Sequence, residues 1–168
     1  MPIATRKVTP CLWFDTQAEE AAKFYVTVFK NSKIKKISRY GEAGRGTHGK
    51  KPGSVMVAEF ELDGQPFVAL NGGPNFKFTE AVSFQVYCDT QDEINHFWNA
   101  LSKGGQEGSC GWLKDKYGLS WQVVPSVIPK MMTDPDNKKS DRVMNAVLKM
   151  KKFDLEKLQQ AYDGETVQ

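Results

Sequence analysis

A strand-and-helix pattern that occurs twice constrains the fold of this chain more than any other feature. Asp15-Thr-Gln17 follows one predicted strand, and the same tripeptide follows another as Asp89-Thr-Gln91. The helical stripe after the first copy is Ala21, Phe24, Tyr25 and Val28, and after the second it is Ile94, Phe97, Trp98 and Leu101. Chance similarity is the alternative, but a repeat that includes both the preceding strand and the following helix favours an internal duplication.

The first copy, over about residues 8–74, has the element order strand, helix and three strands. The expected strands cover residues 9–15, 34–40, 56–62 and 66–71, and the helix covers 17–30. Asp63-Gly64 is a strong two-residue hairpin signal between the last two strands. A helix covers one face of such a small sheet, so we expect the other face to contact a partner or a ligand.

The second copy covers about residues 81–125. A strand at 82–88 and a helix at 92–103 precede a hairpin at 110–125. Asp115-Lys-Tyr-Gly118 is typical of the hairpin's tight turn, because aspartate bonds to nearby amides and glycine adopts positive φ. The closing strand alternates Leu119, Trp121 and Val123 with Ser120, Gln122 and Val124, which predicts two distinct faces.

Residues 126–168 lie outside the duplication and predict a helical extension. Residues 140–150 form an amphipathic pattern, and Asp154 precedes a second one that ends at Gly164. We expect this extension to pack on the domain at 1–125 or on a second subunit. A basic segment of the calmodulin-target type is the alternative.

Composition narrows the function classes. A chain of 168 residues with 40% hydrophobic residues and a net charge of +3 is typical of a soluble globular domain and does not indicate nucleic-acid binding. No apolar run approaches the roughly 20 residues that span a bilayer, and the N-terminus lacks the apolar core of a signal peptide. Cys11, Cys88 and Cys110 show no metal-type spacing, which favours reduced thiols and a cytoplasmic location.

The string from Gly111 to Pro125, GWLKDKYGLSWQVVP, resembles the closing hairpin of the glyoxalase/bleomycin resistance/dioxygenase superfamily, which has the vicinal oxygen chelate fold. It is most similar to the PhnB-like branch, also called the 3-demethylubiquinone-9 3-methyltransferase domain family. Pro10–Asp15 and Phe67–Pro74 support this, and the resemblance extends over nearly all of residues 8–162. It implies an α+β fold of paired βαβββ modules that form a cupped sheet, a homodimer, and a small-molecule ligand in each cup.

The resemblance also locates four positions that hold a divalent ion through His, Glu or Gln in metal-using relatives. By strand register these positions are Thr9 or Pro10, Ala69 or Asn71, Ser83, and Gln122. None of them is His, Asp or Glu, and neutral side chains alone would hold a divalent ion weakly. The two histidines, His48 and His96, lie elsewhere. We therefore expect no metal site and no cofactor.

Aromatic and amide side chains on the predicted inner face suit a flat or partly apolar small molecule. The expected ligand-binding residues are Trp13, Asn71, Gln85, Tyr87, Trp112 and Gln122. A purely structural role is equally compatible with Trp13, and it is the expectation for Trp121, which lies opposite Gln122.

Whether the chain catalyses a reaction stays open at this stage. The glycine-rich stretch Gly41–Gly49 lies between two strands and is expected to open no helix, unlike the S-adenosylmethionine loop of common methyltransferases. Glu59 and Glu61 are candidate acid–base groups, although alternation favours a solvent-exposed face for both. The alternatives to a binding protein are an enzyme of the same fold (a lyase, an isomerase or the family-labelled methyltransferase) and a drug-sequestering resistance protein.

Overall fold

The computed structural model describes residues 7–165. It contains two compact units, unit 1 (Met1–Lys77) and unit 2 (Phe78–Gln168). No helix among the described residues is long and apolar enough to cross a membrane.

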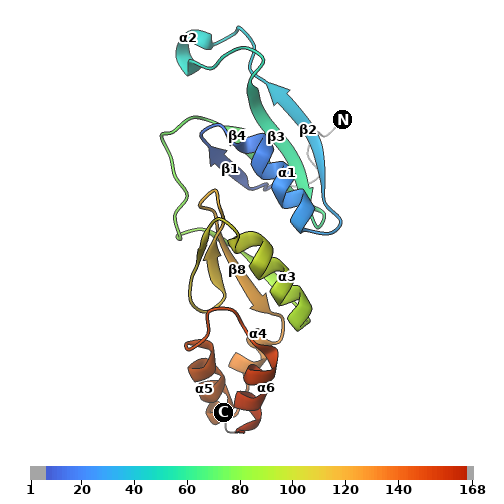
Figure 1. The fold of residues 1–168 in the computed structure, drawn as a ribbon, viewed down its shortest axis with the longest axis vertical. Helices are drawn as coiled ribbons and strands as arrows, with labels where there is room; N and C mark the ends of the chain where they lie inside the picture. Colours follow the sequence, from blue (N-terminus) through green and yellow to red (C-terminus); the bar gives the residue numbers. More distant parts are fainter. Residues whose placement is uncertain (1–6, 166–168) are drawn as a thin grey trace. The chain divides into compact units, whose positions relative to one another are not determined.

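Unit 1 contains one four-stranded mixed sheet. Its elements are β1 (Cys11–Phe14), α1 (Ala18–Val28), β2 (Lys33–Arg39), α2 (Arg45–His48), β3 (Val55–Leu62) and β4 (Gln65–Asn71). The strand order is β1-β4-β3-β2, with β1 parallel to β4 and the other neighbours antiparallel (Figure 1). The turn between β3 and β4 is at Asp63-Gly64, where both residues adopt positive φ as a two-residue hairpin requires.

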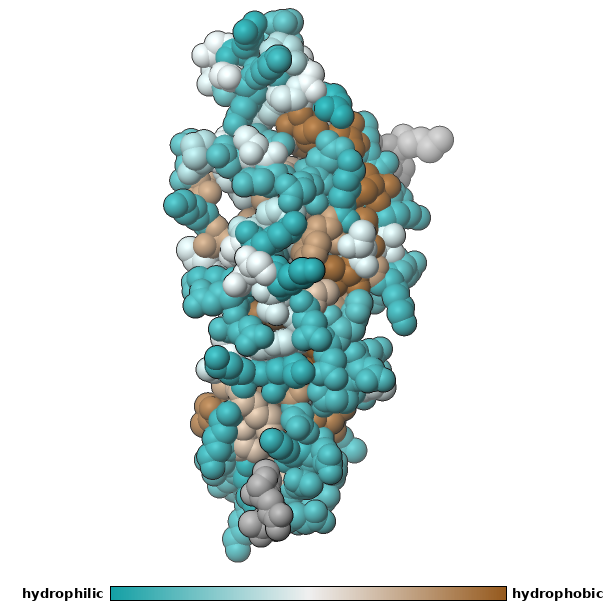
Figure 2. All heavy atoms as spheres, in the orientation of Figure 1, coloured by the Kyte–Doolittle hydropathy of each residue, from teal (hydrophilic) through white to brown (hydrophobic). Residues whose placement is uncertain are grey.

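Helix α1 covers one face of this sheet. Its buried stripe is Ala18, Ala21, Ala22, Tyr25 and Val28. The ring of Tyr25 stacks 6.2 Å from that of Phe60 on β3, and Phe60 lies 5.5 Å from Phe67 on β4. Figure 2 shows apolar side chains over β2 and β3 on a mostly hydrophilic surface. The small alanines allow α1 to approach the sheet closely, so this face is the core of the unit.

Unit 2 repeats the same topology. Its elements are β5 (Ser83–Cys88), α3 (Gln91–Ser102), β6 (Gln106–Glu107), β7 (Trp112–Lys114), β8 (Ser120–Pro125), α4 (Ile128–Met132), α5 (Asn137–Val147) and α6 (Leu155–Asp163). The strand order β5-β8-β7-β6 matches that of unit 1, with the first strand parallel to the last. The prediction of an α+β fold with two βαβββ modules and a C-terminal helical extension is confirmed.

The turn residue Asp115 organises the closing hairpin of unit 2. It is buried, and its Oδ1 accepts hydrogen bonds from the amides of Tyr117 and Leu119. Its Oδ2 accepts from the indole Nε1 of Trp121 at 2.9 Å. Trp121 is 2% exposed on the face that α3 covers, so the prediction that it belongs to the core is confirmed.

The C-terminal helices α4–α6 attach to unit 2 through the segment between α5 and α6. The amides of Cys110 and Gly111 donate to the carbonyls of Met150 and Lys151, each at 2.7 Å. The buried ring of Phe153 occupies the space beside Gly111, where a Cβ would lie 2.5 Å from it. The segment between α5 and α6 therefore contacts the start of the closing hairpin.

Most boundaries differ by a few residues from the sequence predictions, and two short elements were not predicted. Helix α5 begins at Asn137 rather than 140, because Asp136 caps it by accepting from the amide of Lys138 at 2.9 Å. The two-residue strand β6 and the five-residue helix α4 were not predicted, since neither is long enough to show a hydrophobic period.

Candidate functional site

The sheet face of unit 2 that α3 does not cover (the open face of unit 2) holds most of the predicted ligand-binding residues. Gln85 on β5 lies directly opposite Gln122 on β8, and Gln122 lies opposite Trp112 on β7. Tyr87 follows on the same face of β5, where it is 56% exposed. The alternation of buried Val86 and Cys88 with exposed Gln85 and Tyr87 sets this arrangement.

Hydrogen bonds join three of these side chains and Ser83 of β5 into one series, which we call the polar chain. The Tyr87 hydroxyl donates to Gln85 Oε1 at 2.7 Å, and Gln85 Nε2 donates to Gln122 Oε1 at 3.3 Å. Gln122 Nε2 then donates to Ser83 Oγ at 2.8 Å. Each side chain donates to the next one, from Tyr87 to Ser83. Ser83 accepts with its oxygen, so its hydroxyl proton is available to an acceptor.

The open face of unit 1 is more apolar. On neighbouring strands, Trp13 lies beside Leu70 and Cys11 lies beside Val68, all on the face away from α1. Val57 on β3 extends this row, because it lies opposite Leu70. The row was not predicted as a whole, although alternation with the buried Leu12 and Phe14 could have shown it.

Trp13 makes specific contacts within its own unit. Its indole Nε1 donates to the carbonyl of Gly73 at 2.8 Å. The ring of Phe76 packs edge-to-face against the indole, with 4.9 Å between the ring centres. A Cβ on Gly72 would lie 2.1 Å from the indole, so only glycine fits there. Trp13 thus holds the segment after β4 while the residue stays partly exposed.

The placement of Asn71 on the open face was wrong. It is 6% exposed and lies on the face that α1 covers, alternating with Leu70. Its Oδ1 accepts from the amide of Ala18 at 2.8 Å, and its Nδ2 donates to the carbonyl of Val55 at 3.0 Å. Both ends of the amide bind backbone groups, so Asn71 fixes the start of α1 and is removed from the candidate site.

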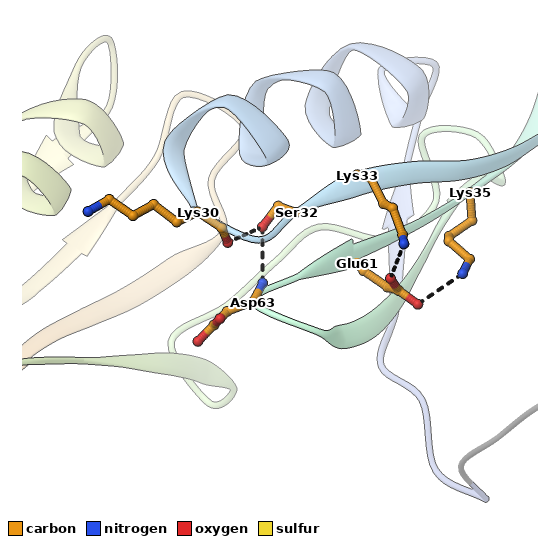
Figure 3. A network of polar contacts seen from close by, with 6 residues as sticks. All are labelled: Lys30, Ser32, Lys33, Lys35, Glu61 and Asp63. Atoms are coloured by element: carbon orange, nitrogen blue, oxygen red, sulfur yellow. Dashed lines mark hydrogen bonds and ion pairs between the residues drawn. The ribbon is translucent and has the colours of Figure 1, made fainter.

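The carboxylates of β3 lie on the exposed side of unit 1, as alternation predicted. Glu59 is exposed opposite Val68. Glu61 contacts Lys35 at 3.2 Å and Lys33 at 3.7 Å, as Figure 3 shows. The hydrogen bond with Lys35, together with the charges of both lysines, lowers the pKa of Glu61. A carboxylate held ionised by two lysines is a weak general base, so Glu61 is a poor catalytic candidate.

The side chains at the positions that the family resemblance assigned to metal ligands are neutral, which does not suit a divalent ion. Ser83 and Gln122 are bonded to each other through a donor nitrogen, and an N–H group does not ligate a metal. Across residues 7–165, no three His, Cys, Asp or Glu side chains come together as a metal-binding group. His96 is exposed on α3, and His48 accepts from the amide of Lys50 through Nδ1 at 3.0 Å.

The glycine-rich loop differs in one respect from its prediction, because it contains the four-residue helix α2. Gly44 and Gly49 flank this helix with positive φ, and His48 packs 4.7 Å from Tyr40 at the loop's base. The helix is one turn long and lies between β2 and β3, two antiparallel strands of the mixed sheet. It therefore does not supply the strand–loop–helix arrangement of a nucleotide-type site.

The thiols of Cys11 in β1 and Cys88 in β5 are poor nucleophiles. Burial raises the pKa of the Cys11 thiol, and burial together with the nearby carboxylates of Glu93 and Asp89 raises that of Cys88 to about 12. Both side chains are therefore protonated at neutral pH, which argues against covalent chemistry at either position.

Comparison with known proteins shows the family. The sequence profile described as 3-demethylubiquinone-9 3-methyltransferase matches residues 6–124. The chain belongs to this family. The match ends before α4, so the helices α4–α6 of this PhnB-like chain lie outside it. No curated protein matches the chain.

Several solved structures are similar to this chain, and the first of them supports the PhnB-like assignment. A Bacillus cereus PhnB protein, described as a candidate 3-demethylubiquinone-9 3-methyltransferase, is 38% identical over 72% of this chain and 100% of its own, with a TM-score of 0.64. A Pseudomonas aeruginosa protein is 17% identical over 70% of this chain and 95% of its own, with a TM-score of 0.55. A glyoxylase/bleomycin resistance protein/dioxygenase domain from Frankia is 13% identical over 70% of this chain and 89% of its own, with a TM-score of 0.40.

Proposed function

We propose that this PhnB-like chain binds a small, flat or partly apolar organic molecule on the open faces of its sheets, without the metal that other branches of the superfamily use. The polar chain carries this proposal. Tyr87, Gln85, Gln122 and Ser83 form an aligned series of donors and acceptors on an exposed surface, beside the indole of Trp112. Such a surface can stack an aromatic ring and fix its orientation through hydrogen bonds. We also propose a cytoplasmic homodimer.

A ligand screen tests the binding proposal. Purified protein is screened by thermal shift against quinols, aromatic antibiotics and S-adenosylmethionine, and each stabilising compound is then titrated by calorimetry. We expect Gln122→Ala and Tyr87→Phe each to raise the Kd of the best compound about fivefold, because a net hydrogen bond contributes roughly 1 kcal/mol. Gln159→Ala, on the exposed side of α6, is the matched control. Unchanged Kd values in both site variants would refute the site.

Elemental analysis tests the absence of a metal. The protein is purified without chelators and its zinc, nickel, manganese and iron contents are measured. We expect much less than one metal ion per chain, since the open-face groups are amides and hydroxyls. One equivalent of any of these metals, lost in Gln122→Ala, would overturn the metal-free proposal.

The family description supports a second candidate function, methyl transfer to a demethylated quinol. The profile match over residues 6–124 and the 38% identity to the Bacillus cereus protein are the observations that favour it. In that reaction a phenolic oxygen takes the methyl group of S-adenosylmethionine and loses its proton, and S-adenosylhomocysteine is released. Release of S-adenosylhomocysteine in the presence of a catechol substrate would support the transferase. A stabilised protein without turnover would favour binding or sequestration.

A further inference from the structure

The hydroxyl of Ser120 is buried without a hydrogen-bond partner among residues 7–165. Ser120 is 1% exposed and is the first residue of β8. Buried polar groups in folded proteins almost always have a partner, and an unpaired one destabilises the fold. A hydroxyl left unpaired at this position therefore requires an explanation beyond packing.

Ser120 lies at a cavity of about 120 Å³ in unit 2. Trp112 and Lys114 of β7 line the same cavity, together with Gln106 of β6 and Glu80 of the segment before β5. A water molecule occupies roughly 30 Å³ in the liquid, so the cavity holds a group of about four non-hydrogen atoms. This is the size of a carboxylate with the carbon atom to which it is attached, so the rest of an aromatic ring would have to lie outside.

The cavity adjoins the polar chain. Ser120 pairs with Ser83 on one side and with Lys114 on the other, and it shares the open face of unit 2 with Gln122. Trp112 both lines the cavity and lies opposite Gln122. A molecule whose ring lies against Trp112 and the polar chain can therefore place a polar substituent beside Ser120.

The charges at the cavity indicate which substituent it suits. Lys114 forms an ion pair with Glu80, whose pKa this contact lowers. Both partners are partly exposed, at 34% and 62%, and such a pair contributes little net free energy. A carboxylate from a ligand can thus replace that of Glu80 beside Lys114, and it would also accept the unused proton of Ser120.

We propose that the Ser120 cavity binds the carboxylate of a small aromatic acid, with Lys114 exchanging Glu80 for the ligand and the ring lying against Trp112. This inference rests on the proposed function, and it specifies the ligand class for the open face of unit 2.

Benzoate and benzamide test the inference as a matched pair, because they share size and shape and differ in charge. Their Kd values are measured by calorimetry on the full chain. We expect benzoate to bind at least tenfold more tightly than benzamide. Ser120→Ala should raise the Kd for benzoate roughly tenfold or more, since a hydrogen bond to a charged group is lost. Lys114→Met should remove the preference for benzoate, and Glu80→Gln should lower the Kd about twofold to fivefold by removing the competing carboxylate.

Two exposed residues supply the controls: Ser109→Ala and Lys138→Met should leave both Kd values unchanged. Ser120→Ala also has a second readout, because removing an unpaired buried hydroxyl should raise the Tm of the ligand-free protein. Equal binding of benzoate and benzamide, no binding of benzoate by the unsubstituted protein, or unchanged binding in Ser120→Ala would each overturn the inference. If another compound still binds and is lost in Gln122→Ala, the proposed function stands while this inference fails.

Discussion

Gln122 on β8 donates from Nε2 to Ser83 Oγ on β5 at 2.8 Å. These are two of the four positions that the family resemblance assigns to metal ligands, and they lie on the first and last strands of the unit. The hydrogen bond between them uses the Gln122 nitrogen and one lone pair of the Ser83 oxygen. The pair is thus suited to extending a network of hydrogen bonds toward an organic ligand rather than to holding an ion.

Gly72→Ala should destabilise the protein by about 2 kcal/mol, because its Cβ would lie 2.1 Å from the indole of Trp13. Urea denaturation followed by tryptophan fluorescence measures the effect. Gly41→Ala is the matched control, since a Cβ there meets nothing within 4 Å, and it should change the free energy of unfolding by less than about 0.5 kcal/mol. Equal effects for the two variants would contradict the packing of Trp13 on Gly72.

Phe153→Ala should cost roughly 3–5 kcal/mol, since it empties a buried aromatic position beside Gly111. We expect the amides of Cys110 and Gly111, which donate to the segment before α6, to exchange their hydrogens faster in this variant. Leu148→Ala, at a side chain that is 63% exposed, is the control and should change little. Slow exchange at both amides in Phe153→Ala would show that the extension does not depend on this ring.

The raised pKa of Cys88 predicts a loss of stability at alkaline pH. Burial is the main cause of the shift to about 12 from an ordinary value of 9.0. Below pH 9 the thiol is protonated in both the folded and the unfolded state, so its ionisation does not lower the free energy of unfolding. Between pH 9 and 12 only the unfolded state loses the proton, and stability falls as the pH rises.

Cys88→Ala provides the comparison for this effect. Its free energy of unfolding, measured by urea titration from pH 8 to 10.5, should fall less steeply with pH than that of the unsubstituted protein. Parallel curves for the two proteins would mean that Cys88 has an ordinary pKa in the folded state.

The sequence predicted the open face of unit 2 better than that of unit 1, for a physical reason. In β5, polar Gln85 and Tyr87 alternate with apolar Val86 and Cys88, so only one register buries the apolar side. In β4 both faces are mainly apolar, and the pattern around Leu70 and Asn71 does not distinguish them. Asn71 was therefore assigned to the wrong face.

Other features could not be predicted because they depend on contacts distant in sequence. The amide of Asn71 is held by the backbone of Ala18 and Val55, which no local pattern shows. The Ser120 cavity is lined by Glu80, from the segment before β5, and by Lys114 of β7, which are distant in sequence and form an ion pair. The closing hairpin was predicted well, since the bonds that Asp115 makes to Tyr117, Leu119 and Trp121 are all local.

The binding of a small molecule on the open face of unit 2 is tested by a nitrogen–proton correlation spectrum, recorded while the most stabilising compound of the screen is added. We expect the side-chain amide signals of Gln85 and Gln122 and the indole signal of Trp112 to shift in a saturable manner. Signals from α5 and α6 should stay in place. A compound that saturates the protein while shifting only signals of α4–α6, or none on the open face of unit 2, would show that the ligand site lies elsewhere.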